Sequence, residues 1–177
     1  MQINAKLSKD KRIEIAAEEI FSKYGYEKAT LDQIISLADV GKGTVYKYFG
    51  NKEQLFYKLV SAKNEPFVEA LRVAVESESE LKDKLTAYFK VMVEFYQKNC
   101  ALWQIIYYEM LNDTHCTVVF DAEDNAQVIS RYSEDTVSDE VKERFLRYHN
   151  LLTSEFEILY KIVVDGMKEG TLKSGNA

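Results

Sequence analysis

The sequence predicts an all-α protein in which a three-helix N-terminal domain is joined by a linking helix to a helical C-terminal domain. Its 177 residues include one proline and seven glycines, which is few for a protein built from many strands and turns. Apolar residues recur at spacings of three and four over several segments, which is the period of an amphipathic helix. Helix-capping residues stand at the ends of these segments. We assign residues 1–52 to the first domain and 53–177 to the second.

The first two helices are predicted from an apolar stripe and from a capping pattern. The first stripe ends at Gly25, where a residue in the left-handed conformation would stop the helix. Thr30 stands three residues before Gln33, which is the spacing of a capping box at the start of a second, short helix. The apolar positions of the two helices are Ile13, Ala16, Ala17, Ile20, Phe21 and Tyr24, then Leu31, Ile34, Ile35 and Ala38.

A third short helix is predicted over residues 42–49, after a break at residues 39–40. Val45 and Phe49 are four residues apart and would face inward from it. Asn51 is then placed to cap a fourth helix that begins at Lys52. We expect Pro66 to end or kink this fourth helix near Asn64, because proline cannot donate a backbone hydrogen bond.

Three further helices and one possible helix are predicted in the second domain. One long apolar face runs from Leu81 to Tyr96, and a separate, shorter helix follows between Trp103 and Leu111. The pattern then weakens, with a single helix suggested around Ala122, Ala126 and Ile129. Ser138 begins a last long helix, whose predicted packing seam is Phe145, His149, Leu152, Phe156, Leu159 and Val163.

The segment from Thr30 to Phe49 has the arrangement of a helix-turn-helix: two short helices, a connection of three to four residues and a supporting helix before them. Short helix pairs also occur as plain core packing, but the outward positions of the second helix favour DNA. Lys42 and Lys47 suit phosphates, while Thr44 and Tyr46 suit base edges and thymine methyls. Gly43 costs a helix about 1 kcal/mol relative to alanine, so either a DNA strand or an internal neighbour must approach it closely.

The run Lys42-Gly-Thr-Val-Tyr-Lys-Tyr-Phe49, followed by Lys52-Glu-Gln-Leu55 and preceded by Phe21-Ser-Lys-Tyr-Gly-Tyr-Glu-Lys-Ala-Thr30, closely resembles the reader domain of the tetracycline-repressor (TetR) family. The resemblance implies a homodimeric regulator, usually a repressor, that binds a palindromic double-stranded DNA operator and releases it when a small molecule enters the C-terminal domain. It also implies a recognition helix at residues 42–49 and a phosphate contact at Lys52, for which a solvated lysine is the alternative. The DNA-binding residues are therefore expected to be Thr30, Lys42, Gly43, Thr44, Tyr46, Lys47, Tyr48 and Lys52.

Three positions depart from the family's usual pattern. Asp39 replaces the common glycine of the turn, which aspartate tolerates because it visits the left-handed conformation more readily than most residues. Gly41 replaces a serine or threonine that would cap the recognition helix and contact a phosphate. The ending Gly166-Met-Lys-Glu-Gly170 normally precedes about two further helices of the dimer interface, so we expect either a shortened chain or a different dimer.

An effector site is predicted among the aromatic residues of the second domain. The candidate ligand-binding residues are Tyr88, Phe95, Trp103, Tyr107 and His149. Each of them could equally fill the core. The effector itself is unknown and is expected to be apolar or cationic; Glu94 and Glu109 could face a cation or simply be solvated. No cofactor is predicted, and the residues around His115 match no metal-ligand spacing.

Charge and motif content limit the other functions. The net charge is −6, but residues 1–65 carry eleven basic and nine acidic residues, while residues 66–177 carry twelve and twenty. A mildly basic reader on an acidic body is thus expected, in a cytoplasmic protein without a membrane span. No hydrolase, zinc-protease or dinucleotide motif points to an enzyme. The alternative function is a helical protein–protein adaptor, which would show no salt-dependent affinity for DNA.

Overall fold

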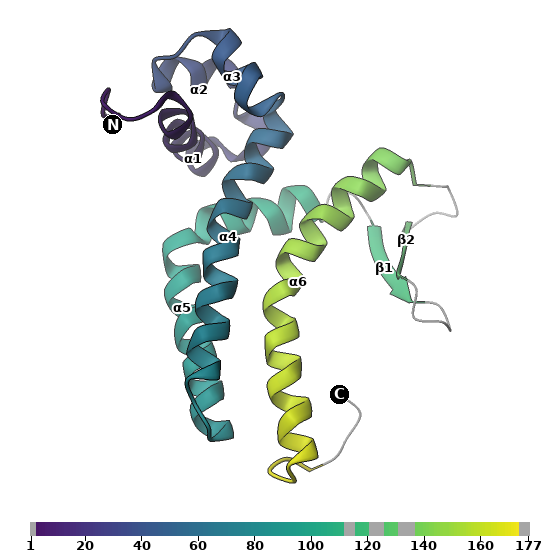
Figure 1. Ribbon diagram of the computed structural model, residues 1–177. Helices are drawn as coiled ribbons and strands as arrows, with labels where there is room; N and C mark the ends of the chain where they lie inside the picture. The colour runs from purple at the N-terminus through teal and green to yellow at the C-terminus, as the bar shows by residue number, and fades with distance from the viewer. Residues whose placement is uncertain (1–2, 112–115, 121–125, 131–136, 174–177) are drawn as a thin grey trace. The chain divides into compact units, whose positions relative to one another are not determined.

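The computed structural model describes residues 3–111, 116–120, 126–130 and 137–173, and the described part of the chain is mainly helical. The all-α class predicted above is confirmed, with one small β-hairpin added to it (Figure 1). The elements in chain order are α1 Lys9–Lys28, α2 Leu31–Ala38, α3 Lys42–Phe49, α4 Lys52–Glu76, α5 Leu81–Ile105, the π-helical turn η1 Ile106–Leu111, β1 Cys116–Phe120, β2 Ala126–Ser130 and α6 Asp139–Lys168.

The chain divides into two compact units, and both contain parts of α4 and α5. The first unit comprises Met1–Lys63 and Ala101–Asp113, and the second comprises Asn64–Cys100 and Thr114–Ala177. None of the helices in the described segments has the length of uncharged, apolar sequence that a membrane span requires.

The core of the first unit lies between α1, α2, α3 and the start of α4. Phe21 and Phe56 meet edge to face with ring centroids 4.9 Å apart, and Tyr26 approaches Phe56 in the same way at 5.4 Å. Gly25 has a φ of 75°, so the predicted left-handed stop is present, although one further turn follows it within α1. The buried apolar side chains of α1, α2 and α3 are Ile13, Ala16, Ala17, Ile20, Phe21, Ile34, Ala38, Val45 and Phe49.

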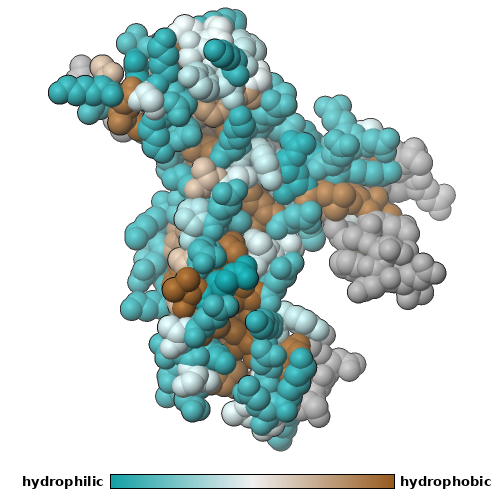
Figure 2. Space-filling view, viewed as in Figure 1, coloured by the Kyte–Doolittle hydropathy of each residue, from teal (hydrophilic) through white to brown (hydrophobic). Residues whose placement is uncertain are grey.

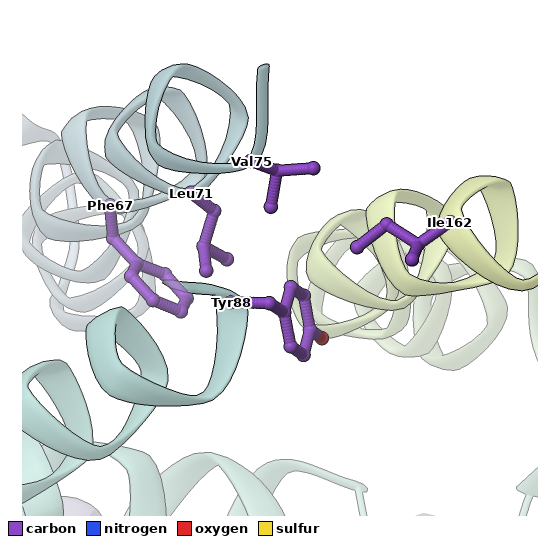
Figure 3. Packing of buried hydrophobic residues seen from close by; sticks show 5 residues of the cluster. All are labelled: Phe67, Leu71, Val75, Tyr88 and Ile162. Atoms are coloured by element: carbon purple, nitrogen blue, oxygen red, sulfur yellow. The ribbon is translucent and has the colours of Figure 1, made fainter. Parts of the chain in front are cut away.

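The core of the second unit is formed by α4, α5 and α6. Figure 3 shows how Phe67, Leu71 and Val75 of α4 approach Tyr88 of α5 and Ile162 of α6. All five side chains are buried, at no more than 8% exposure. The α4 positions are spaced by four residues, so one stripe of that helix supplies its whole contribution to this cluster.

The last helix begins where the sequence predicts, and its buried face differs from the predicted seam at Phe156. The Ser138 hydroxyl accepts from the amide of Val141 at 3.4 Å and caps α6. Phe145 and Leu152 of the predicted seam are buried, whereas Phe156 is 49% exposed and Glu155 beside it is fully buried. The seam prediction was therefore wrong at Phe156, because it counted apolar residues alone and overlooked a buried acid.

Two expected helix boundaries are absent from the described helices. α4 continues through Pro66 to Glu76, so the prediction that proline could end the helix was wrong. α5 runs without interruption from Leu81 to Ile105 and is followed by the π-helical turn, so the residues from Trp103 onward do not begin a separate helix. A helix of 25 residues gains its stability from packing along its length, which outweighs a local helix-breaking signal.

The single helix suggested around Ala126 and Ile129 was also wrong. β1 and β2 pair antiparallel in this region, with Thr117 opposite Ile129 and Val118 opposite Val128. The strand Cys-Thr-Val-Val-Phe is rich in β-branched and aromatic residues, which favour an extended chain. That composition was the available signal, and the spacing of three apolar residues concealed it.

Candidate nucleic-acid interface

The turn between α2 and α3 is held by the side chains on both sides of it. The predicted capping box is confirmed: Gln33 N donates to Thr30 Oγ1 at 3.2 Å, and Thr30 N donates to Gln33 Oε1 at 2.9 Å. Asp39 adopts the left-handed conformation expected of it, with a φ of 50°. The guanidinium of Arg12 on α1 donates to the Asp39 carbonyl and, at 3.0 Å, to Asp39 Oδ2. The turn that sets the angle between the two helices is thus tied to the supporting helix.

α3 has an inner and an outer face. Val45 and Phe49 are 1% and 6% exposed and pack inward, as predicted. The outer positions are exposed or, for Thr44, half-buried: Lys42, Gly43, Thr44, Tyr46, Lys47 and Tyr48. The domain that carries these residues is at the top of Figure 2, where its visible surface is mainly hydrophilic. The inner residues fix the helix, which leaves the outer ones available to a partner.

The outer groups have the chemistry of a DNA-reading surface. The Lys42 ammonium lies 3.5 Å from the exposed Asp32 carboxylate and 6.0 Å from the centre of the Tyr46 ring. Such an exposed ion pair is weak, so phosphate can replace the carboxylate at little cost. Lys47 is exposed and has no partner among the described residues. Tyr46 and Tyr48 are 46% and 45% exposed, which leaves both phenols accessible.

The surroundings of Gly43 show which of the two predicted reasons for this glycine applies, close approach of a DNA strand or close approach of an internal neighbour. A Cβ placed on it would meet nothing within 4 Å in the described chain, so no internal neighbour requires the glycine. The backbone of Gly43 is instead exposed on the outer face of α3, with no side chain covering it. A glycine that weakens a helix and makes room for nothing inside the protein is consistent with close approach by an external body such as a sugar-phosphate strand.

Lys52 is engaged within the protein. Its ammonium donates to the carbonyls of Tyr26 at 2.9 Å, Ala29 at 3.3 Å and Glu27 at 3.4 Å, and lies 4.3 Å from the centre of the Tyr26 ring. These carbonyls belong to the end of α1, where helical partners run out. In this structure Lys52 therefore closes the end of the supporting helix, and a phosphate contact at this residue stays a prediction.

Lys52→Met is expected to lower the free energy of unfolding of the first unit by about 2 kcal/mol, because hydrogen bonds to a charged donor are worth about 1.5–3 kcal/mol. Methionine keeps the apolar stem and removes the ammonium. Urea denaturation followed by circular dichroism measures the loss, with Lys23→Met as the control on an exposed part of α1. Equal stability of the two variants would show that the carbonyl contacts contribute little.

Two residues of this region were missed by the sequence analysis. Arg12 fixes the turn at Asp39, as described above. Lys58 of α4 donates to the carbonyl of Tyr48 at 2.7 Å and lies 5.2 Å from the centre of the Phe49 ring, so it closes the end of α3. The contacts join residues 27 and 10 positions apart, and neither leaves a spacing signal in the sequence.

The predicted ligand-binding residues are divided between the two units. Tyr88, Phe95 and His149 belong to the second unit, whereas Trp103 and Tyr107 belong to the first. Tyr88 and Trp103 are buried, Tyr107 is 41% exposed, and the His149 ring lies over Phe145 with centroids 5.7 Å apart. Glu94 is exposed; the side chain of Glu109 and the residues around His115 lie outside the described part of the chain.

Comparison with known proteins points to bacterial transcriptional regulators. Residues 15–59 match the family model described as bacterial regulatory proteins, tetR family. The uncharacterized HTH-type transcriptional regulator YhgD of Bacillus subtilis is 27% identical over 94% of this chain and 73% of its own length. The fatty acid metabolism regulator protein of the same organism is 26% identical over 90% of this chain and 69% of its own length.

Solved structures share the fold. The regulator FadR of Bacillus subtilis, in complex with stearoyl-CoA, superimposes with a TM-score of 0.66 at 21% identity, covering 94% of this chain and 75% of FadR. PfmR of Thermus thermophilus, described as a TetR family transcriptional regulator, gives a TM-score of 0.67 at 18% identity over 93% of this chain and 75% of its own. At these identities the likeness establishes the fold alone.

Proposed function

We propose, on the premise that the chain belongs to the TetR family of bacterial DNA-binding transcriptional regulators, that its α3 reads a palindromic operator as part of a homodimer. The observation that carries the proposal is the outer face of α3, where two lysines, a threonine and two tyrosines surround a bare glycine backbone. Lysines hold DNA through phosphates, and hydroxyl and methyl groups distinguish bases. We also propose that Thr44, Tyr46 and Tyr48 contact the bases, and that Lys42, Gly43 and Lys47 lie against the sugar-phosphate backbone of the DNA.

Selection of bound fragments from random duplex DNA, followed by sequencing, tests this function. A two-fold symmetric consensus is expected, with half-sites about 34–36 Å apart. Affinity for it should fall steeply between about 50 and 200 mM salt, because each phosphate contact releases counterions. An absence of enrichment at any salt concentration would favour the helical adaptor instead.

Alanine substitutions at Tyr46 and Lys47 should have different effects on DNA binding. Tyr46→Ala should weaken binding to the consensus by about 1–3 kcal/mol and leave non-specific binding almost unchanged. Lys47→Ala should weaken both similarly and reduce the salt slope by about one. Fluorescence anisotropy with consensus and scrambled duplexes measures both, with Lys23→Ala of α1 as the control. Unaltered selectivity of Tyr46→Ala would place the reading face elsewhere.

Gly43→Ala should stabilise the protein and weaken its binding to DNA. Alanine in a helix is favoured over glycine by about 1 kcal/mol, and the open space around Gly43 allows the added methyl group. The same methyl group would hold a DNA backbone away from α3. Thermal denaturation and operator titration of one variant measure both effects. A stabilised protein with full operator affinity would show that DNA does not approach Gly43.

We further propose that an effector bound in the helical body controls operator binding, and that the regulator is a repressor. The FadR structure was solved with stearoyl-CoA, which shows that this fold accommodates a small-molecule ligand of that size. The body must then have two arrangements that differ in affinity for the effector, because a ligand shifts an equilibrium only by its differential affinity. The aromatic residues Tyr88 and Phe95 of the second unit are proposed to contribute to the site.

A further inference from the structure

A glutamate interrupts the apolar core of the second unit. Glu155 of α6 is 0% exposed, and Asn64 of α4 at 6% is the other polar residue buried in the described part of the chain. Acidic residues are almost never fully buried unless they are paired, because removing a charge from water is costly. An apolar residue at position 155 would avoid this cost, so the glutamate requires an explanation.

Each of the two buried polar side chains has one oxygen without a partner. The Tyr96 hydroxyl donates to Glu155 Oε1, while Glu155 Oε2 has no hydrogen-bond partner among the described residues. The Asn64 amide nitrogen donates to Leu151 O at 3.1 Å and to Ser154 Oγ at 3.2 Å, while Asn64 Oδ1 likewise has none. Two buried acceptors of the second unit thus have no hydrogen-bond donor among the described protein residues.

Among the described residues, no positive charge is paired with Glu155. Burial raises the pKa of this carboxyl to about 7, while the hydrogen bond from Tyr96 acts in the opposite direction. No basic side chain in the described segments forms an ion pair with it. The carboxyl is thus half ionised near neutral pH, and an entering cation would remove the cost of its charge.

Aromatic side chains surround these two groups. Phe67 stacks on Phe95 with centroids 3.8 Å apart and meets Tyr96 edge to face at 6.3 Å. The Tyr88 hydroxyl donates to the backbone carbonyl of Glu155 at 3.1 Å. The faces of such rings attract organic cations and also pack against apolar groups.

Space for a ligand adjoins the same helix face. A cavity of about 330 Å³ is lined by the apolar side chains of Val75 of α4 and of Ile158 and Ile162 of α6, and by six charged residues, Arg72, Glu76, Glu78, Lys84, Lys161 and Asp165. Ile158 and Ile162 follow Glu155 by three and seven residues, so all three share one face of α6. Tyr88 contacts both Glu155 and the lining of this cavity. Its hydroxyl donates to the backbone carbonyl of Glu155, and its ring packs with Ile162 (Figure 3 shows the ring beside Ile162).

We propose that the second unit binds an organic cation with apolar substituents, whose positive charge lies at Glu155 and whose apolar part lies against the aromatic side chains around it. This inference rests on the proposed function, because it names the class of effector. Asn64 supplies a second acceptor for a protonated amine.

The test compares tetraphenylphosphonium with tetraphenylborate, which are similar in size and apolar surface and opposite in charge. Isothermal titration calorimetry of the full chain at pH 8 should show the cation binding at least tenfold more tightly than the anion. Glu155→Gln should lower the cation's affinity at least tenfold and leave the anion's unchanged. Glu157→Gln, an exposed glutamate of the same helix, should bind as the wild type does. Equal binding of the two ions, or wild-type behaviour of Glu155→Gln, overturns the proposal.

The wild-type protein alone gives a second test, should Glu155→Gln fail to fold. Affinity for the cation should rise about tenfold per pH unit up to about pH 7 and then level off, since the proton competes for Glu155. The titratable side chains that contact Glu155 are Tyr96 and Tyr88 of α5, and burial raises the Tyr88 pKa to about 12; Asn64 and Phe67 of α4 carry no charge. A flat profile overturns the proposal.

Operator binding without any probe, measured on the same samples, separates the two proposals. Operator binding without preference for the cation overturns this inference and leaves the proposed function standing. Preference for the cation without operator binding supports the site at Glu155 and contradicts the proposed function.

Discussion

Phe67→Ala is expected to lower the free energy of unfolding of the α4–α5–α6 unit by about 4 kcal/mol, within the range for a phenylalanine truncated in a core. The ring is 4% exposed, lies parallel to Phe95 at 3.8 Å and meets Tyr96 at its edge. The substitution removes a stacked pair and leaves a cavity between two helices. Urea denaturation followed by far-ultraviolet circular dichroism measures the loss.

Val73→Ala on the solvent side of the same helix is the control for this prediction. Val73 is 58% exposed, so its truncation should change stability by no more than about 0.5 kcal/mol. A loss below about 1 kcal/mol for Phe67→Ala would mean that the aromatic cluster contributes much less than its packing indicates.

The second large effect is a loss of stability as the pH rises. The pKa of Glu155 is about 7 in the folded protein, and its ordinary value is 4.5. Between pH 4.5 and pH 7 the Glu155 carboxyl is protonated to a greater extent in the folded chain than in the unfolded chain. Its protonation therefore contributes fully to the free energy of unfolding below pH 4.5, and this contribution is lost as the pH rises through 7. The total is about 3 kcal/mol, since each pKa unit corresponds to about 1.4 kcal/mol.

Glu155→Gln isolates this contribution from other titrations. Urea denaturation at pH 5 and pH 8 should show the variant gaining about 2.5 kcal/mol relative to the wild type between the two conditions, because part of the total effect lies below pH 5. Parallel pH profiles of the two proteins would show that the Glu155 carboxyl titrates at an ordinary pKa and is not desolvated.

The structure of α1, α2 and α3 could be predicted from the sequence because the capping and turn contacts that define these helices are local. Thr30 and Gln33 form the expected capping box, Asp39 takes the expected left-handed conformation, and Asn51 Oδ1 accepts from Gln54 N at 2.8 Å at the start of α4. Each of these contacts joins residues within one turn, where spacing alone determines whether they can meet. The outward face of α3 followed from the same local periodicity.

The other features depend on contacts that spacing does not encode. Lys52 reaches Tyr26 because the first helix and the fourth pack together, which no local pattern reveals. Glu155 was missed because a search for apolar periodicity passes over a charged residue, although its neighbour Phe156 is the exposed one. The β-hairpin was missed because the spacing of Ala122, Ala126 and Ile129 is typical of a helix, while the β-branched residues of the segment favour strands.

The contacts described above close loops of different lengths, and we expect the shorter loops to close first. The bonds that secure the reader, from Arg12 to Asp39 and from Lys52 to Tyr26, span 27 and 26 residues. The bonds of the second unit, from Asn64 to Leu151 and from Tyr88 to Glu155, span 87 and 67. Because short loops close faster than long ones, we expect α1, α2 and α3 to pack together before α6 packs on the second unit.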